Sequence, residues 1–338
     1  MPSNSARTES PTAGRRDPVD EFELIRRFFD RAPPSGLELG IGDDAALLRA
    51  GRNAAGEAES LVVTTDMLIA GRHFVSAVEP ESLGHKALAV NLSDLAAMGA
   101  RPEAFTLALA LPEVNEDWLE VFARGMFALA DRHGCELAGG DTTRGPLTIS
   151  ITALGRVPSG SALRRDHAEP GDDLWVSGAL GAAAWATRER LAGRDATLSA
   201  AARRRLDWPE PRIGLGLALR HLARAAIDLS DGLAGDLGHI CERSRVGAQL
   251  NWAEIPVAGE LAALPESERI ELALAGGDDY ELLFSAVPEN RSALTALGTR
   301  GSVALTRIGA IVPGTGVTVL DGRGRTVSVA RAGFNHFA

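Results

Sequence analysis

Apolar residues recur along this chain with two different periods, and these periods predict alternating helices and strands. From Glu21 the apolar positions follow helical spacing, and Pro33-Pro34 should end this first helix. Helical spacing returns over Glu81–Ala100 and over Asn115–Gly134. The latter segment is amphipathic, and its final glycine is typical of a helix end.

Runs of β-branched and apolar residues lie between the predicted helices. SLVVTTDMLI, over Ser60–Ile69, predicts a strand that ends near Asp66, and AFTLALAL and LTISITALGRV predict two more strands. Pro158–Asp173 is rich in turn-forming and charged residues, and strands and helices alternate again beyond it. The expected fold class is therefore α+β (mixed α/β), with a disordered tail and two domains over residues 1–18, 19–157 and 158–338.

The composition narrows the class of protein. A chain of 338 residues, of which 45% are hydrophobic, is long enough for two cores. Its formal net charge of −10 argues against nucleic acid or an anionic membrane as a partner, because both are bound through basic patches. No apolar run approaches the ~20 residues of a membrane span. Cys135 and Cys241 form no CxxC pair, so the expected location is the reducing cytoplasm.

Aspartates recur at the ends of the predicted elements, and each one alone is explained by a turn or a helix cap. Asp43 and Asp44 are adjacent, and no lysine or arginine lies within four residues of them. A ring of such carboxylates would repel itself unless divalent cations bind there. Oxygen ligands favour magnesium, so the expected counter-ion of Asp43 and Asp44 is a metal ion that serves a phosphate substrate.

Two segments leave their role open. Asn91 and Asp94 share one face of a predicted helix, which either faces solvent or lines a site. Gly178–Trp185 would place a helix N-terminus beside a phosphate, but a plain strand-to-helix turn explains it equally well. The P-loop, dinucleotide-binding and nucleophile-elbow motifs are absent from the chain.

Several blocks of the sequence together resemble the thiamine-monophosphate kinase family. They are ELGIGDDAALL, TTDMLIAGRHF, KALAVNLSDLAAMGARP, GGDTTRGP, AIDLSDGLAGDLGHI and LAGGDDYELLF. The resemblance runs from Glu21 to Phe337, and the wider superfamily is similar to aminoimidazole ribonucleotide synthetase. It implies an enzyme that uses several Mg²⁺ ions to transfer the γ-phosphoryl of ATP to thiamine monophosphate. It also implies a homodimer in which the first domain binds metal and ATP and pairs its sheet across the dimer, while the second domain completes the active site.

The resemblance also implies roles for individual residues, carried over motif by motif. The implied metal ligands are Asp43, Asp44, Thr64, Thr65, Asp66, Asp94, Asp141, Asp228 and Asp231. Asp94, Asp141 and Asp228 are the residues expected to be essential for catalysis. The implied ATP contacts are Gly140, Asp141, Arg165 and Ser230, and the implied contacts to thiamine monophosphate are His73, Asp278 and Phe334.

Some points stay open within this resemblance. The family often has glutamate at the position of Asp278 and tyrosine at that of Phe334, and the choice between Asp43 and Asp44 as metal ligand is not decided. One alternative is another ATP-dependent enzyme of the superfamily, although a selenophosphate synthetase would need a reactive cysteine upstream of Asp43. The other is a non-catalytic binder of nucleotide or thiamine phosphate, which should have lost some of the metal aspartates.

Overall fold

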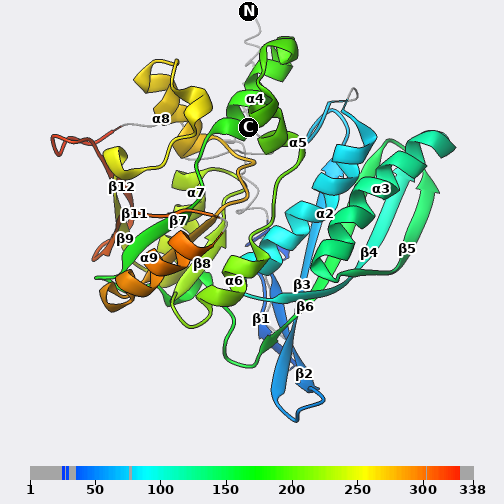
Figure 1. Ribbon diagram of the computed structural model, residues 1–338. Coiled ribbons are helices and arrows are strands. Elements are labelled where there is room, and N and C mark those ends of the chain that lie inside the picture. Colours follow the sequence, from blue (N-terminus) through cyan, green and yellow to red (C-terminus); the bar gives the residue numbers. More distant parts are fainter. Residues whose placement is uncertain (1–24, 27, 30–35, 76–77, 302, 328–338) are drawn as a thin grey trace, which may run out of the picture. The chain divides into compact units, whose positions relative to one another are not determined.

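The computed structural model describes residues 25–26, 28–29, 36–75, 78–301 and 303–327. Residues 33–334 form one compact unit, which contains both sheets, and this unit is described here by itself (Figure 1). Residues 1–18, expected to be a disordered tail, and Phe334 lie outside the described residues. In the predicted first helix, the amide of Phe29 donates to the carbonyl of Ile25 at 2.9 Å, as in a helical turn.

The first sheet has the strand order β1-β2-β3-β6-β4-β5. Its neighbours pair antiparallel, except that β4 and β5 are parallel and are connected through α3. Helices α2 and α3 pack side by side against it (Figure 1). The bounds are β1 (Leu37–Leu39), β2 (Ala46–Arg52), β3 (Ala58–Ile69), α2 (Pro80–Ala97), β4 (Arg101–Leu111), α3 (Glu116–His133), β5 (Glu136–Arg144) and β6 (Thr148–Pro158).

The long helix α2 is buried on almost every side, because it packs against the sheet, α3 and α6 (Ile213–Leu219). Glycines make these helix contacts close. A Cβ atom on Gly84 would lie 2.0 Å from the carbonyl oxygen of Phe122 in α3, and one on Gly216 would lie 2.0 Å from that of Ala96. The predicted helix over Glu81–Ala100 is thus confirmed, and its burial explains why it shows no polar face.

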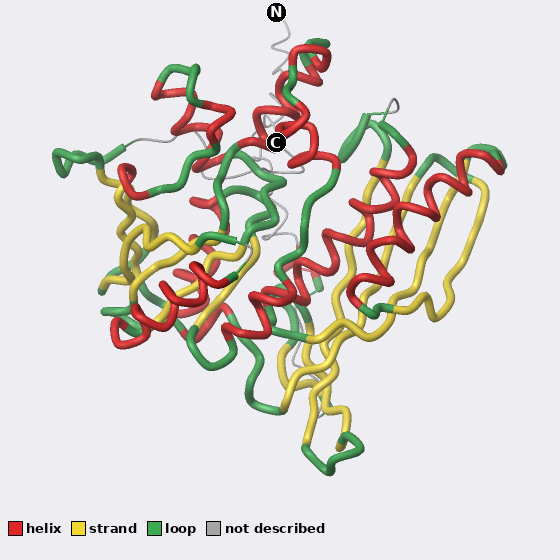
Figure 2. The backbone as a smooth tube through the Cα atoms, viewed as in Figure 1, coloured by secondary structure: helices red, strands yellow, loops and turns green. Residues whose placement is uncertain are grey.

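The second sheet has the order β12-β9-β11-β7-β10-β8 and is antiparallel except for the pair of β12 and β9. The strands are the yellow segments of Figure 2. The expected mixed α+β class is confirmed. Its strands are β7 (Asp173–Ser177), β8 (Ala225–Asp228), β9 (Gly247–Asn251), β10 (Leu282–Ala286), β11 (Leu305–Val312) and β12 (Gly316–Leu320). Its helices are α4 (Ala182–Leu191), α5 (Ala200–Asp207), α7 (Leu233–Ser244), α8 (Glu266–Ala275) and α9 (Arg291–Arg300).

One strand boundary differs from the expected one, because β3 continues through Asp66 to Ile69. Asp141 lies inside β5, and Asp228 is the last residue of β8. Among the described residues, the helices are all too short or too polar to cross a membrane.

Candidate functional site

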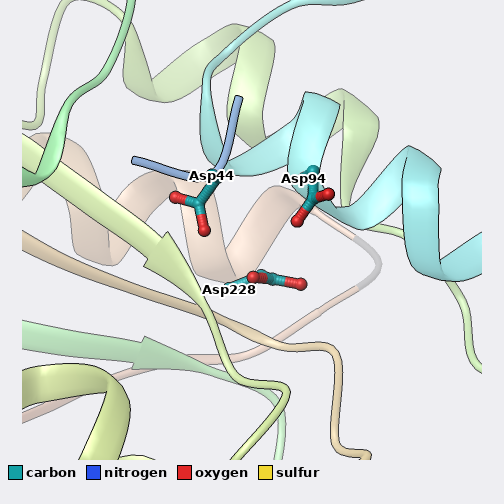
Figure 3. A group of neighbouring side chains, drawn as sticks. All are labelled: Asp44, Asp94 and Asp228. Carbon is teal, nitrogen blue, oxygen red and sulfur yellow. The ribbon is translucent and has the colours of Figure 1, made fainter. Parts of the chain in front are cut away.

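Three carboxylates from distant parts of the chain meet in one place (Figure 3). Asp44 follows β1, Asp94 lies on α2, and Asp228 ends β8 in the second sheet. One carboxylate oxygen from each residue lies within 4.8 Å of the other two. The cluster therefore joins the two sheets of the molecule through groups of like charge.

The segment of α2 around Asp94 sets the positions of these carboxylates. Thr64 Oγ1 of β3 donates to Asp94 Oδ2 at 2.5 Å, and Ser93 Oγ donates to Asp228 Oδ2 at 2.6 Å. The Asn91 side chain accepts from the amide of Asp66 at 3.0 Å. Asn91 is 1% exposed, so the open choice between solvent and site is decided: this face of the helix lines the cluster.

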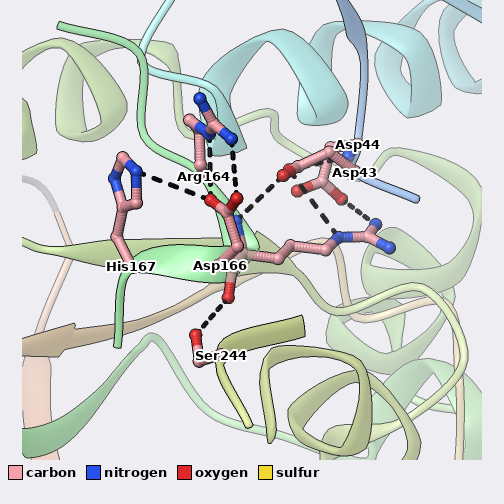
Figure 4. Close-up of polar contacts among 7 residues, drawn as sticks. Asp43, Asp44, Arg164, Asp166, His167 and Ser244 are labelled. Atoms are coloured by element: carbon pink, nitrogen blue, oxygen red, sulfur yellow. Dashed lines mark hydrogen bonds and ion pairs between the residues drawn. The ribbon is translucent and has the colours of Figure 1, made fainter. Parts of the chain in front are cut away.

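Arg165 is the counter-ion of the adjacent pair Asp43 and Asp44. Figure 4 labels these two aspartates and Ser244. Arg165 Nη2 donates to Asp44 Oδ1 at 2.5 Å, and its backbone amide donates to Asp43 Oδ2 at 3.0 Å. The hydroxyl of Ser244, at the end of α7, donates to the carbonyl of Arg165 at 2.7 Å and so holds this segment in place. The expectation that a metal ion would be the counter-ion instead of a protein group was wrong. Arg165 is 121 positions from Asp44 in the sequence, so a search of the four neighbouring residues on each side does not reach it.

Burial and mutual repulsion change the acidity of the cluster. Burial and the Asp44 carboxylate raise the pKa of Asp43 to about 7, and burial with the charges of Asp231 and Asp44 raises the pKa of Asp66 to about 6. Burial, chiefly, also raises the pKa of Asp94 and of Asp228 well above its usual range. Such a site gains stability from any additional positive charge.

One oxygen of the cluster has no hydrogen-bond partner among the described residues. Asp44 Oδ2 is buried and receives no donor, although buried carboxylate oxygens are normally paired. Three oxygens at these separations suit a hard divalent cation. The residues present therefore fit a magnesium ion.

The metal ligands implied on β3 fall on both faces of the sheet. Thr64 and Asp66 share the face toward α2, and Asp66 feels the charges of Asp44 and Asp231. The Thr65 side chain lies on the opposite, exposed face, where its hydroxyl hydrogen-bonds that of Thr152 at 2.8 Å. The structure does not bring the Thr65 hydroxyl to the cluster.

Gly140 and Asp141 also lie apart from the cluster within this chain. They occupy the exposed edge strand β5, which β4 and β6 separate from β3. Neighbouring strands are about 4.8 Å apart, so Asp141 on β5 lies roughly 14 Å from Asp66 on β3, measured across the strands. A Cβ atom on Gly140 would lie 1.8 Å from the carbonyl oxygen of Leu107, so close strand packing alone requires this glycine.

A loop of the second domain approaches the cluster with a strained backbone. Asp278 and Tyr280 have φ angles of +70° and +48°, a region that residues other than glycine rarely adopt. The amide of Asp278 donates to the carbonyl of Ser230 at 2.9 Å, and the Tyr280 hydroxyl donates to Asp278 Oδ1 at 3.0 Å. Strain of this kind is concentrated at functional sites.

His73 lies in the wall of a pocket between the loop after β3, the start of α2 and the helices α4 and α5. Its Nδ1 accepts from the amide of Ile69 at 3.0 Å, which fixes the ring. Phe74, Val78, Leu83 and Lys86 also line this pocket. Its mixed lining suits a small molecule with an apolar ring and a charged group.

The open question at Gly178–Trp185 has a structural answer. The amide of Gly181, at the start of α4, donates to both carboxylate oxygens of Asp279, at 3.1 and 2.9 Å. The Asp279 carboxyl group therefore occupies this helix N-terminus, where a phosphate was the alternative.

Comparisons with known proteins agree on one family. Residues 42–157 and 169–322 match the N-terminal and C-terminal domains of the AIR synthase related proteins. Thiamine-monophosphate kinase from Escherichia coli is 46% identical over 94% of this chain and 98% of the relative. The crystal structure of the Stenotrophomonas maltophilia thiamine-monophosphate kinase is 50% identical, with a TM-score of 0.77 over 87% of this chain and 93% of that chain. A structure described as AaThiL complexed with AMPPCP and TMP is 31% identical, with a TM-score of 0.80 over 94% of this chain and 97% of that chain.

Proposed function

This chain belongs to the thiamine-monophosphate kinase family of AIR synthase related proteins, and from that premise we propose that it phosphorylates thiamine monophosphate with ATP. The products are thiamine diphosphate and ADP. The observation that carries the proposal is the meeting of Asp44, Asp94 and Asp228, which come from the segment after β1, from α2 and from the end of β8. A kinase of two anionic substrates needs a cation site there.

We propose that the cluster holds magnesium, with Asp44, Asp94 and Asp228 as the central ligands and Asp66 and Asp231 beside them. When bound, Mg²⁺ neutralises the charge of the phosphates. Asp43 accepts a hydrogen bond from the Arg165 amide, whereas Asp44 Oδ2 has no hydrogen-bond partner among the described residues. This difference favours Asp44 as the metal ligand of the adjacent pair.

The chemistry needs neither a general base nor a nucleophile from the protein. The acceptor is a phosphate with a second pKa of about 6, so it is largely dianionic at neutral pH. Burial raises the pKa of Cys135 and Cys241 to about 11, so neither thiol is activated. We therefore propose direct in-line transfer, in which the residues of the site hold two mutually repelling phosphates in position.

The remaining assignments divide between nucleotide and acceptor. Arg165, which pairs with Asp44, and Ser230, which follows Asp228 by two residues, are proposed to contact ATP. His73 and Asp278, with Phe334, are proposed to contact thiamine monophosphate. Gly140 and Asp141 are proposed to act from strand β5. The two domains are proposed to divide near residue 158, and the protein is proposed to be cytoplasmic.

A homodimer is proposed because β5 is an edge strand, and within the described part of the chain one of its sides pairs with no strand. All of its residues are exposed in the isolated chain, and bare edges are normally covered. A second copy on this edge would shield Asp141. Sedimentation should give twice 35.5 kDa, whereas a mass of 35.5 kDa would refute the dimer.

The central test is an assay of purified protein with ATP, MgCl₂ and thiamine monophosphate. Thiamine diphosphate that forms only when all three are present is the expected result. ATP hydrolysis without thiamine diphosphate would favour another enzyme of the superfamily, and binding without turnover would favour a non-catalytic binder. Retention of configuration at a chiral γ-phosphate, or radiolabel left on the protein after ATP alone, would contradict direct transfer.

A further inference from the structure

Lys86 is the only lysine of the chain, and it is buried beside the pocket of His73. It lies on α2, and its side chain is 8% exposed. Its ammonium nitrogen lies 3.0 Å from Asp278 Oδ2, across a separation of 192 residues. A buried ammonium group is costly to desolvate, so its position calls for an explanation.

The hydrogen bonds of this ammonium group are incomplete. An ammonium group has three donors. Among the described residues, Asp278 is its single hydrogen-bond partner, and the Tyr280 ring lies 6.0 Å away. The ammonium group therefore has donors left for an acceptor that enters the pocket.

Two arginines, Arg190 and Arg165, are engaged by carboxylates. Arg190, in the wall of the same pocket, donates to both oxygens of Asp207 at 2.6 and 2.8 Å and to Asp195 at 2.7 Å. Arg165 is paired with both Asp43 and Asp44. Lys86 differs from these two cations because a single carboxylate, that of Asp278, pairs with it among the described residues.

The position of Lys86 connects the pocket to the acidic cluster. Phe74, Val78 and Leu83 form part of the apolar lining on one side. On the other side, the Tyr280 hydroxyl bonds Asp278, and the charges of Asp278, Asp66 and Asp228 add to burial in raising the pKa of Tyr280. A ring system held in the pocket would thus extend its charged end past Lys86 toward the carboxylates.

We propose that Lys86 binds the phosphate of thiamine monophosphate through its ammonium group, an inference that rests on the proposed function. The ammonium group of Lys86 makes the site select thiamine monophosphate over thiamine, which has a hydroxyl group in place of the phosphate. Lys86 and Asp278 offer a cation and an anion side by side, which complements a ligand that carries both a phosphate and a cationic ring. Asp278 is the counter-ion of Lys86 when the phosphate is absent.

The test compares two ligands that differ only in the phosphate, thiamine monophosphate and thiamine, by calorimetry on wild type and Lys86→Met. For the variant, affinity for thiamine monophosphate should fall about tenfold to hundredfold, the range for a lost charge-assisted hydrogen bond. Affinity for thiamine and for a non-hydrolysable ATP analogue should change less than about threefold, since a merely structural role would affect both thiamine ligands equally. Arg124→Met, which removes an equal charge from an exposed pair with Glu81, is the control and should change neither affinity.

Equal losses for both thiamine ligands, or no loss for either, would overturn the role of Lys86. Wild-type protein that fails to make thiamine diphosphate would instead overturn the proposed function itself.

A second measurement needs no variant. Protein labelled at the lysine side chain gives a single side-chain NMR signal, because Lys86 is the only lysine. Thiamine monophosphate should shift this signal strongly and thiamine only weakly. Equal shifts from the two ligands would contradict the proposal.

Discussion

At the scale of single residues, the acidic cluster combines opposite charges in one buried space. The Asp43 and Asp44 side chains are 0% and 1% exposed, and Arg165 is the cation beside them. Asp94 and Asp228 add negative charge, and among the described residues only the weaker influence of Arg165 on Asp228 offsets it. Changing one charge of either sign should therefore have opposite effects on the metal-free protein.

Asp94→Asn tests the removal of one negative charge from the cluster. The amide can still accept from Thr64, and the loss of a repelling charge should raise the thermal stability of metal-free protein. Formation of thiamine diphosphate at saturating magnesium should fall about a hundredfold or more, since transition-state charge is left unbalanced. Thermal unfolding in EDTA and a product assay measure both effects, and near-normal turnover would exclude Asp94 as a metal ligand.

Arg165→Met tests the removal of the positive charge beside Asp43 and Asp44. Two buried carboxylates would lose their cation, so metal-free protein should lose about 3–5 kcal/mol of unfolding free energy, the usual cost of breaking a buried pair. The loss should shrink when magnesium is added, because the metal supplies positive charge to the same oxygens. Urea unfolding with and without MgCl₂ measures this, and a loss that magnesium leaves unchanged would contradict the shared site.

At the scale of elements, helix α2 organises the site because it touches every layer around it. Three of its side chains bond to groups outside the helix. Asp94 accepts from Thr64 of β3, Ser93 donates to Asp228 at the end of β8, and Lys86 donates to Asp278. Close glycine contacts with α3 and α6 hold the helix in place. Small displacements of α2 should therefore affect the site as well as stability.

Two glycines of α6 provide a matched test. Gly216→Ala would place a Cβ atom 2.0 Å from the Ala96 carbonyl oxygen and should cost about 1–3 kcal/mol or more, as overpacking does. Gly214→Ala, in the same helix, meets no atom within 4 Å and should stabilise by about 0.4–1 kcal/mol. Chemical denaturation of both variants measures the difference, and equal effects would refute the close contact between α2 and α6.

At the scale of the whole molecule, the cluster couples folding to pH and to magnesium, because it joins both sheets. Asp43 and Asp66 have pKa values of about 7 and about 6 in the folded protein, above the ordinary value of 3.8 that the unfolded chain retains. Between these values the folded state binds more protons than the unfolded state. The free energy of unfolding of metal-free protein must then fall as pH rises from about 4 to about 7, and level off above that range.

Magnesium should reverse this trend. It binds the ionised carboxylates, so its stabilising effect should grow as pH rises from 5 to 8. Thermal unfolding in EDTA and in MgCl₂ at several pH values measures both curves. A magnesium effect that is the same at every pH would show that the cluster does not release protons on binding.

Much of the fold was predictable because helix and strand periods arise from local backbone geometry. The amphipathic helix α3 ends at Gly134, whose φ of +61° is a left-handed helix end, as the sequence indicates. Local geometry also explains one mixed result: side chains alternate along a strand, so Thr64 and Thr65 point to opposite faces and cannot both reach one site with their hydroxyls.

The sequence by itself determined that the chain has aspartates suited to bind a metal ion, and where its helices and most of its strands lie. Only the tertiary structure decided how they meet: Arg165 with Asp44 across 121 residues, Ser93 with Asp228 across 135, and Lys86 with Asp278 across 192. The physical reason is that periodicity records what a segment buries, whereas the pairing of charges depends on which segments the sheets and α2 bring together.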